Sequence, residues 1–338
     1  MEPFSFSFII PVYNRPDEIE ELLGSFEKLK GTSTFEVLVV EDGSNQRSDG
    51  IVAQYRDRLN ISYYFKKNTG PGDSRNFGMQ KASGNYFIIL DSDCLLPQDY
   101  LLQVKSYLQE EFVDCYGGPD ASHPTFSNIQ KAIDFSMTSL ISTGGIRGGK
   151  MANKDFQPRS FNMGISEQAF LASGGFGDIH PGEDPDLAIR LKKLGFKIAL
   201  FPKAFVYHKR RVSLIKFYRQ VNKFGMARPI LNSWHPKTKK LVFWFPSLFM
   251  VGLLCSTLLM VANIYLPIAI YAGYFAIAFV VALFQHKTIN IALLSIIAIF
   301  IQFFGYGSGF LKSFFCTEIL KKNPRLIFPN LFFVKRNS

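Results

Sequence analysis

Two carboxylates separated by one residue follow a short apolar stretch and are the first candidates for chemistry. Asp91 and Asp93 come directly after the Tyr-Phe-Ile-Ile-Leu stretch at 86–90. Paired carboxylates at a strand end suit a hard divalent cation, Mg²⁺ or Mn²⁺, that also binds phosphate oxygens. Such a cation offsets the charge that builds up on a departing diphosphate. Short Asp-x-Asp strings also occur in solvated turns, so the interpretation depends on the surrounding residues.

A second acidic cluster and one arginine could complete such a site. The string Glu183-Asp184-Pro185-Asp186 precedes a predicted helix over 187–194. Acids are favoured in the first turn of a helix, but three acids in four positions exceed that need. Arg75 lies in the first turn of a predicted helix over 72–82, where N–H groups and a cation favour phosphate. The alternative for Arg75 is an ordinary surface arginine.

The elements around these residues alternate between strand and helix. Nearly continuous apolar strands separated by helical patterns predict an α/β fold with a mostly parallel sheet. Ligands bind such sheets at the carboxyl ends of the strands. Three predicted strands end in polar clusters that would line one crevice: Tyr13-Asn14-Arg15, Glu41-Asp42-Gly43-Ser44 and Asp91-Ser92-Asp93. The predicted strands are 6–12, 35–40, 61–65 and 86–90, and the predicted helices between them are 17–29, 46–57 and 72–82.

Five segments in a fixed order resemble the inverting family 2 glycosyltransferases, which share the GT-A fold. The resemblance covers about residues 5–225, or two thirds of the chain. The segments are SFIIPVYNRPDEIEELLGSF, FEVLVVEDGS, NTGPGDSRNFGMQKASGNYFIILDSD, FNMGISEQAF and GEDPDLAIRLKKLGFK. Glu41 departs from the family pattern, which more often has aspartate at that position.

The resemblance implies roles for individual residues. It assigns Asp184 as the base that takes the proton of the acceptor hydroxyl, because an inverting transfer is a single displacement that needs one base. It assigns Asp91 and Asp93 to a metal-bound diphosphate, with His208 as a further metal or diphosphate contact. The alternative for His208 is a capping histidine before a basic helix. The residues that it assigns to donor binding are Pro11, Tyr13, Glu41, Asp42, Arg75 and Asp91.

The acceptor side of the site is less sharply indicated. The candidates for acceptor binding are Asn162, Met163 and Glu183, together with Arg159. For all of these except Glu183, packing in the core or in a turn is an equal alternative. The string Gln-Val-Asn-Lys-Phe at 220–224 stands where processive synthases of the superfamily carry Gln-x-x-Arg-Trp. The tryptophan that stacks on a growing sugar chain is absent, which favours the transfer of one or a few sugars.

The second half of the chain is basic and then apolar. Ten Lys or Arg residues and no acid lie between His208 and Lys240, and Lys287 is the one Lys, Arg, Asp or Glu over 241–311. This pattern favours a membrane surface as the partner rather than nucleic acid, for which no recognition motif is present. Residues 212–226 are expected to form an amphipathic basic helix on the membrane.

Three apolar segments, 242–262, 264–284 and 289–311, are each long enough to cross a membrane. The basic stretch before them predicts that the first 240 residues are cytoplasmic. Three full crossings would leave the basic tail 312–338 on the opposite side, against the same rule. The number of crossings, two or three, therefore stays open.

The sequence predicts four parts and one activity. The parts are a GT-A domain over 1–207, a basic interfacial helix and linker over 208–240, transmembrane helices over 241–311 and a basic tail over 312–338. The expected activity is transfer from a nucleotide-sugar, a UDP-sugar, to a lipid-linked or glycan acceptor at the cytoplasmic face of the inner membrane, in envelope polysaccharide or glycolipid synthesis. The alternatives are a processive polysaccharide synthase and a non-catalytic membrane scaffold or transporter component with a degenerate transferase domain.

Overall fold

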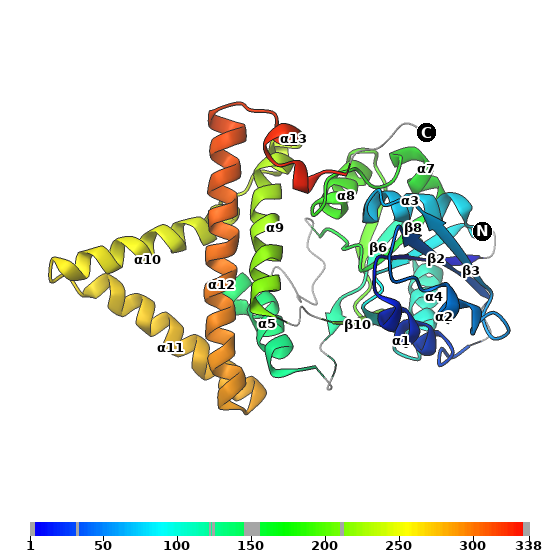
Figure 1. Ribbon diagram of the computed structural model, residues 1–338, viewed down its shortest axis with the longest axis horizontal. Helices are drawn as coiled ribbons and strands as arrows, with labels where there is room; N and C mark the ends of the chain where they lie inside the picture. The colour runs from blue at the N-terminus through cyan, green and yellow to red at the C-terminus, as the bar shows by residue number, and fades with distance from the viewer. Residues whose placement is uncertain are drawn as a thin grey trace. The chain divides into compact units, whose positions relative to one another are not determined.

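The computed structural model describes residues 4–31, 34–121, 123, 126–144, 156–209 and 213–333 (Figure 1). The first residue of the predicted basic helix, 212, and the end of the predicted tail, 334–338, lie outside these residues. The chain divides into two compact units. We call them the sheet unit (1–123, 150–208 and 332–338) and the helical unit (124–149 and 209–331).

The sheet unit is built on a seven-stranded sheet with the order β3-β2-β1-β4-β8-β6-β9. The first four strands along the chain are parallel, whereas β8 runs antiparallel to both of its neighbours. The predicted mostly parallel α/β sheet is therefore confirmed. The strands are β1 Phe6–Val12, β2 Phe35–Asp42, β3 Ile61–Lys66, β4 Tyr86–Leu90, β6 Cys115–Gly117, β8 Asn162–Ser166 and β9 Ile198–Leu200.

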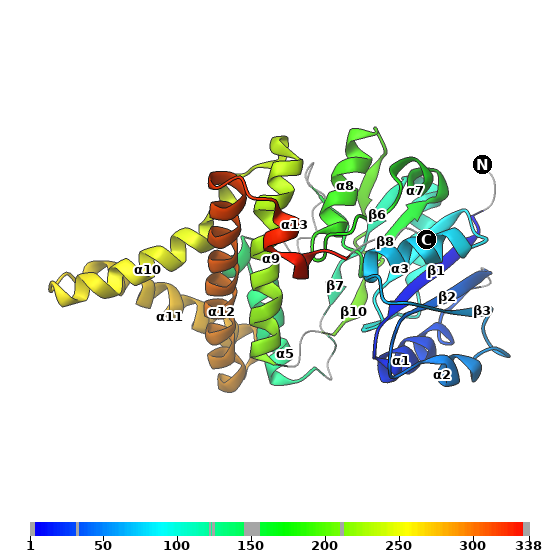
Figure 2. The ribbon, with the colours of Figure 1, turned by 45° about the horizontal axis from the view of Figure 1, so that its top comes forward.

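Helices cover both faces of this sheet because its strands are apolar on both sides (Figure 2). One face packs against α1, α2 and α4, and the other packs against α3, α7 and α8. These helices are α1 Pro16–Phe26, α2 Asp49–Ala53, α3 Pro71–Lys81, α4 Tyr100–Glu110, α7 Glu167–Ser173 and α8 Glu183–Lys193.

Three element boundaries differ from the sequence-based expectation. Strand β2 extends to Asp42, so Glu41 and Asp42 are strand residues rather than the start of a turn. The predicted helix 46–57 is shorter, with α2 restricted to Asp49–Ala53. Helix α8 begins at Glu183 and not at 187, so its first turn itself carries the acidic cluster. This start agrees with the preference of carboxylates for helix N-termini.

A small second sheet lies at the edge of the candidate site. Its strands are β5 Cys94–Leu95, β7 Asp120–Ala121 and β10 Val206–His208, in the order β5-β10-β7. Strand β10 runs antiparallel to β5, and His208 is paired with Cys94. This pairing brings His208 next to Asp93, although 115 positions separate them in the sequence.

The helical unit contains two long helices that lie side by side, α9 and α12 (Figure 1). Their backbones approach closely where glycines leave room, and the side-chain amide nitrogen of Asn222 donates to the carbonyl of Gly305 at 2.9 Å. The predicted basic helix over 212–226 is thus the first part of a longer helix with a buried face. The helices of this unit are α5 Asn128–Thr138, α6 Leu140–Thr143, α9 Leu214–Trp234, α10 Phe245–Val261, α11 Leu266–His286, α12 Ile289–Phe314 and α13 Pro324–Ile327.

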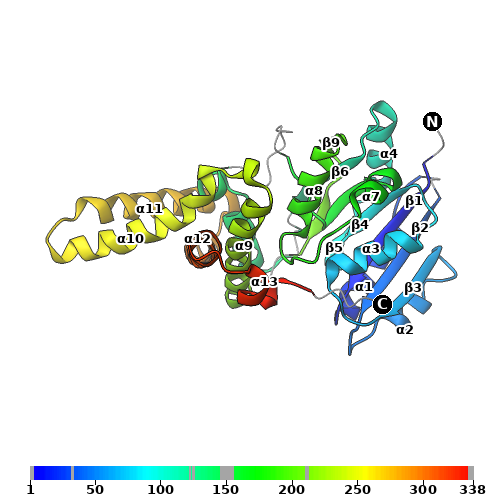
Figure 3. The same cartoon turned by 90° about the horizontal axis from the view of Figure 1, so that it is seen from above.

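Among the residues that the structure describes, three helical segments are long and apolar enough to cross a membrane, as predicted: Leu241–Val261, Leu266–His286 and Ile289–Ile319. The first two include α10 and α11, which run next to each other as a hairpin (Figure 3). Only 17% and 11% of their most apolar windows are buried, against 39% for the third segment. The third segment is more buried because α12 packs against α5, α9, α10 and α11. Four short helical turns that the structure describes lie before, within or after these segments: η1 Pro236–Thr238, η2 Leu241–Trp244, η3 Phe315–Ile319 and η4 Pro329–Leu331.

Candidate active site

Arg75 joins two carboxylates from different parts of the sheet unit. Its guanidinium donates to Asp91 Oδ1 at 2.8 Å and to Glu183 Oε1 at 3.0 Å, and its side chain is only 3% exposed. Burial lowers the pKa of Arg75, but the two carboxylates outweigh that effect and raise it. The end of β4, the N-terminal half of α3 and the first turn of α8 therefore meet at one charged network.

Glu183 has a second partner in this network. His180 Nδ1 lies 2.8 Å from Glu183 Oε1. Burial alone would raise the pKa of Glu183, but His180 and Arg75 lower it to about 2. The sequence analysis did not identify His180, although its position three residues before Glu183 was a usable signal.

Asp184 differs from its neighbour in its environment. Its side chain is 15% exposed, and its nearest cation is Arg159, with 3.6 Å between Nη1 and Oδ2. Burial raises the pKa of Asp184, the charge of Glu183 adds to this effect, and Arg159 opposes it. A carboxylate with a raised pKa is a better proton acceptor than an ordinary one. The third acid of the cluster, Asp186, pairs with Arg190 within α8 at 2.9 Å.

Asp93 and His208 form the second cluster of the site. His208 Nε2 lies 3.1 Å from Asp93 Oδ1, and Arg15 Nη1 lies 3.2 Å from Asp93 Oδ2. The ring of Phe161 stacks on the His208 imidazole, with 4.6 Å between ring centroids. Asp120 Oδ2 lies 3.8 Å from His208 Nδ1, on the other side of the imidazole. The sequence analysis gave no role to Asp120 or Phe161.

The donor atoms of this cluster fit a divalent cation. Potential ligand atoms of Asp93, Cys94 and His208 all lie within 4.8 Å of one another. A carboxylate and an imidazole are ligands that Mn²⁺ accepts. The Cys94 thiol is a poor ligand because burial raises its pKa well above the usual range, and the thiol instead donates to the carbonyl of Phe161 at 3.4 Å. The residues present therefore fit a cation held by Asp93 and His208, with Asp91 nearby in the chain.

The carboxylates of Glu41 and Asp42, at the end of β2, are held in place by several hydrogen bonds. Glu41 is fully buried and accepts hydrogen bonds from the Ser44 hydroxyl and, at 2.8 Å, from the Ser48 amide. Asp42 accepts from the amides of Thr69 at 3.0 Å and Gly70 at 2.9 Å. These bonds tie the end of β2 to the turn that precedes α3.

The other two predicted donor-binding residues lie on or just after β1. Pro11 is buried within the strand, next to Val40 of β2. Tyr13 follows the strand and is 50% exposed, so its ring is open to a ligand. A nucleotide-binding role for both residues remains a prediction.

Two of the predicted acceptor-side residues lie in the interior. Asn162 is completely buried, accepts a hydrogen bond from the Tyr100 hydroxyl at 2.6 Å and donates to the carbonyl of Ala204 at 2.8 Å. Met163 is also completely buried and packs in the core on the α3, α7 and α8 face. This geometry favours core packing, the alternative considered for both residues. Glu183 is likewise buried, but it belongs to the charged network.

The comparisons with known proteins agree with this architecture. Residues 7–168 match the family model of glycosyl transferase family 2. An uncharacterized glycosyltransferase of Rickettsia bellii is 38% identical over 128 residues, which cover 37% of this chain and 17% of the relative. The poly(ribitol-phosphate) beta-N-acetylglucosaminyltransferase TarS of Staphylococcus aureus is 36% identical over 112 residues, which cover 32% of this chain and 20% of the relative.

One solved structure is similar over most of the chain. It is the mannosyltransferase PcManGT from Pyrobaculum calidifontis in complex with GDP-Man and Mn²⁺. The TM-score is 0.63 at 16% sequence identity, and the match covers 90% of this chain and 88% of that one. The chain spans only about a fifth of the length of the two curated relatives above. From the family match, we conclude that residues 7–168 form a domain of glycosyl transferase family 2, and the sheet order and this structural similarity show that it has the GT-A fold.

Proposed function

We propose that the protein transfers a sugar from a nucleotide-sugar, a UDP-sugar, to an acceptor hydroxyl with inversion at the anomeric carbon. The observation that carries the proposal is the pair of neighbouring carboxylates at the start of α8. Glu183 is tied to Arg75 and His180, whereas Asp184 has a raised pKa and a longer contact to Arg159. Glu183 would fix the first turn of α8, which leaves Asp184 to accept the proton of the acceptor hydroxyl.

A divalent cation, Mg²⁺ or Mn²⁺, would be held by Asp91, Asp93 and His208. The solved structure of PcManGT contains a nucleotide-sugar and Mn²⁺, which supports this assignment. The cation would supply charge neutralisation for the leaving diphosphate. The side chains of this protein would do the rest: Asp93 and His208 hold each other in place, and Arg15 limits the movement of Asp93. Arg75 would orient Asp91 and bring positive charge toward the phosphates.

The nucleotide would bind over the carboxyl ends of β1 and β2. The exposed ring of Tyr13 offers a surface for the base. Asp42 would act mainly by holding the turn before α3, through its bonds to Thr69 and Gly70. Glu41 would likewise shape the pocket, because its carboxylate is occupied by Ser44 and Ser48.

The acceptor would be a lipid-linked or glycan hydroxyl at the cytoplasmic face of the inner membrane, in envelope polysaccharide or glycolipid synthesis. The basic and apolar segments after His208 support a membrane-bound acceptor. The altered Gln-Val-Asn-Lys-Phe string supports transfer of one or a few sugars rather than a long chain.

The path of the chain supports an even number of membrane crossings. The chain leaves the sheet unit after His208, and Phe332 and Phe333 belong to that unit again. Phe332 forms a β-bridge with Ile179, and the amide of Phe333 donates to the carbonyl of Asp178 at 2.9 Å. A chain that starts and ends on the same side crosses an even number of times. We therefore propose that α10 and α11 cross as a hairpin while α12, the more buried helix, does not.

This topology also agrees with the charge distribution. The basic residues after α12, among them Lys321, Lys322 and Arg325, would be cytoplasmic together with the catalytic domain. Single cysteines test it in intact cells, in a background without Cys255 and Cys316. Asn263→Cys, between α10 and α11, should react with an impermeant maleimide, and Lys321→Cys should react only after permeabilisation. Labelling of Lys321→Cys in intact cells would refute the even count.

The activity is tested by incubating the full-length protein with a panel of nucleotide-sugars, Mn²⁺ and lipid or glycan acceptors. We expect nucleotide release with a UDP-sugar, a β-linked product and a requirement for the cation. Asp184→Asn should abolish transfer and keep donor binding, measured as a thermal shift. No transfer from any donor would favour the non-catalytic alternative, and a ladder of long products would favour the processive one.

A further inference from the structure

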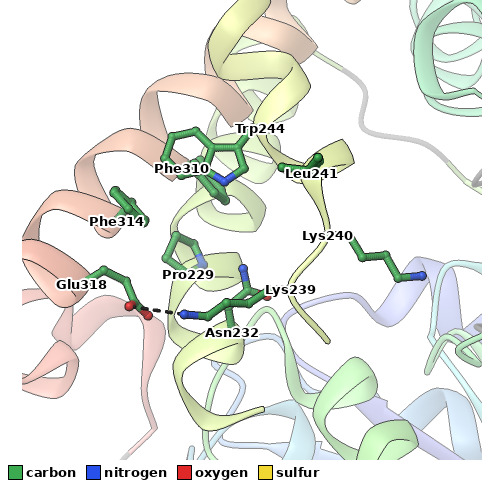
Figure 4. Close-up of a pocket in the computed structure, with 9 residues that line it drawn as sticks. All are labelled: Pro229, Asn232, Lys239, Lys240, Leu241, Trp244, Phe310, Phe314 and Glu318. Atoms are coloured by element: carbon green, nitrogen blue, oxygen red, sulfur yellow. Dashed lines mark hydrogen bonds and ion pairs between the residues drawn. The ribbon is translucent and has the colours of Figure 1, made fainter. Parts of the chain in front are cut away.

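A cavity of about 170 Å³ lies within the helical unit, where the basic linker meets the first apolar helix (Figure 4). Its walls come from the second half of α9, from the linker and η2, and from the C-terminal part of α12 with η3. One water occupies about 30 Å³ of liquid, so the cavity has room for about five waters or for a phosphate with a few attached carbons.

The floor of the cavity carries a buried polar side chain. Asn232 is 8% exposed, and its Oδ1 atom accepts no hydrogen bond from any of the residues that the structure describes. In Figure 4 the side chain points from α9 toward Lys239. A buried amide is normally hydrogen-bonded, because removing it from water without a partner is unfavourable. Asn232 therefore indicates a ligand with hydrogen-bonding groups.

The rim of the cavity is positively charged. Lys239 and Lys240 line it, and both are exposed. Glu318, the single acid of residues 209–331, lies 3.4 Å from Lys239 Nζ and 4.0 Å from Lys321 Nζ. The charged residues that line the cavity are therefore two lysines, Lys239 and Lys240, and one carboxylate, and this net positive charge suits an anionic group such as a phosphate.

The remaining wall is aromatic and apolar. Trp244 packs edge-to-face on Phe310 and Phe314, with ring centroids 4.9 Å and 4.7 Å apart. Leu241, the first residue of the apolar segment, is 89% exposed. Tryptophan and lysine next to the end of an apolar helix are typical of the membrane interface, where lipid headgroups lie. The ligand would then have acyl chains that run along the apolar segment.

We propose that this cavity binds the headgroup of an anionic phospholipid whose headgroup alcohol carries hydroxyls. Lys239 would bind the phosphodiester, Lys240 would add positive charge at the rim, and the Asn232 amide and the Glu318 carboxylate would accept hydrogen bonds from the hydroxyls. The bound lipid would hold α9, the linker and α12 together. This site requires no sugar donor and stands independently of the transferase reaction.

Native mass spectrometry of the full-length protein in detergent, titrated with phosphatidylglycerol, tests the site. We expect tight binding of phosphatidylglycerol and weaker binding of phosphatidylcholine, which lacks headgroup hydroxyls and net charge. The double variant Lys239→Gln/Lys240→Gln should bind phosphatidylglycerol about 30-fold more weakly, which corresponds to about 2 kcal/mol at about 1 kcal/mol per lysine. Lys237→Gln is the matched control, because Lys237 lies in η1 and does not line the cavity.

A second variant separates lipid binding from folding. Asn232→Leu removes the amide but keeps a side chain of similar size, so the lipid-free protein should melt at the same or a higher temperature. The rise in melting temperature on adding phosphatidylglycerol should be lost. The proposal is overturned if the double variant binds like Lys237→Gln, if phosphatidylcholine binds equally well, if Asn232→Leu keeps the full lipid-induced rise, or if inorganic phosphate gives the same stabilisation at the same concentration.

Discussion

Replacing Glu183 with glutamine should destabilise the sheet unit, and the environment of Glu183 gives the size of the loss in folding free energy. Glu183 is 4% exposed and pairs with Arg75, which is 3% exposed. Breaking a buried ion pair typically costs about 3–5 kcal/mol, because the remaining charge stays buried with less compensation. The pKa of Glu183 leads to a similar figure. It lies at about 2 instead of 4.5, and a tenfold change in an ionisation constant corresponds to about 1.4 kcal/mol, so the ionised form contributes about 3 kcal/mol.

The same pKa defines how the effect depends on pH. Because the pKa of Glu183 is lower in the folded protein than in the unfolded chain, its contribution is fully present above about pH 4.5. It is lost as the pH falls from there through about 2. The difference between wild type and Glu183→Gln should therefore be largest near neutral pH and should shrink in acid.

Two buried cysteines provide the assay. Cys94 and Cys115 of the sheet unit are completely buried, so a thiol reagent reaches them only when this unit opens. Labelling of the full-length protein over a urea series, read by peptide mass spectrometry, gives the unfolding midpoint of the sheet unit. Glu111→Gln is the control, because Glu111 is 68% exposed and its ion pair with Lys197 should contribute at most about 1 kcal/mol. Equal midpoints for Glu183→Gln and Glu111→Gln, or a difference that is unchanged at acidic pH, would refute the reasoning.

Three further outcomes follow from the site. Arg159→Gln removes the cation that lowers the pKa of Asp184, so the acidic limb of the pH–rate profile for sugar transfer should move to higher pH. Arg159→Lys should largely restore the wild-type profile. An unchanged acidic limb in the glutamine variant would show that Asp184 does not accept the proton. Asp93→Ala should raise the Mn²⁺ concentration for half-maximal activity by at least about tenfold, and His208→Ala should act in the same direction. An unchanged metal titration would exclude these residues from the cation site. Gly70→Ala should destabilise the sheet unit by about 1–3 kcal/mol or more in the thiol assay, because Gly70 has φ +95° and an added Cβ would lie 2.3 Å from the Phe333 ring. Wild-type stability of this variant would show that Phe333 does not pack there.

Local sequence patterns were sufficient for the framework of the fold and indicated candidates for part of the site. The apolar runs at 6–12 and 86–90 and the helix signal after Pro71 correspond to β1, β4 and α3. Asp91 and Asp93 follow from the end of one such run, because a strand that stops at a sheet edge leaves its next residues in the ligand crevice. The helices that are long and apolar enough to cross a membrane were equally predictable, since length and hydropathy are local properties.

Only the tertiary structure decided which side chains meet. Arg75 and Glu183 are 108 positions apart, and His208 reaches Asp93 only because β10 pairs with β5. No local pattern encodes these pairings, which depend on the strand order and the crossovers. The same holds for the acceptor-side candidates. Asn162 and Met163 stand in a motif next to the site, but the pleat of β8 and the neighbouring elements bury both side chains.

The sequence by itself determined the residue types: carboxylates after strands, a basic stretch before apolar helices, and an acidic helix start. Burial and pairing were decided in three dimensions, and they give the two acids at 183 and 184 opposite pKa shifts. The path of the chain end was also decided there. The contacts of Phe332 and Phe333 with residues 178–179 return the C-terminal segment to the sheet unit. The physical reason is common to all of these features: the ionisation and position of a side chain depend on the dielectric and the partners around it, and long-range folding supplies both.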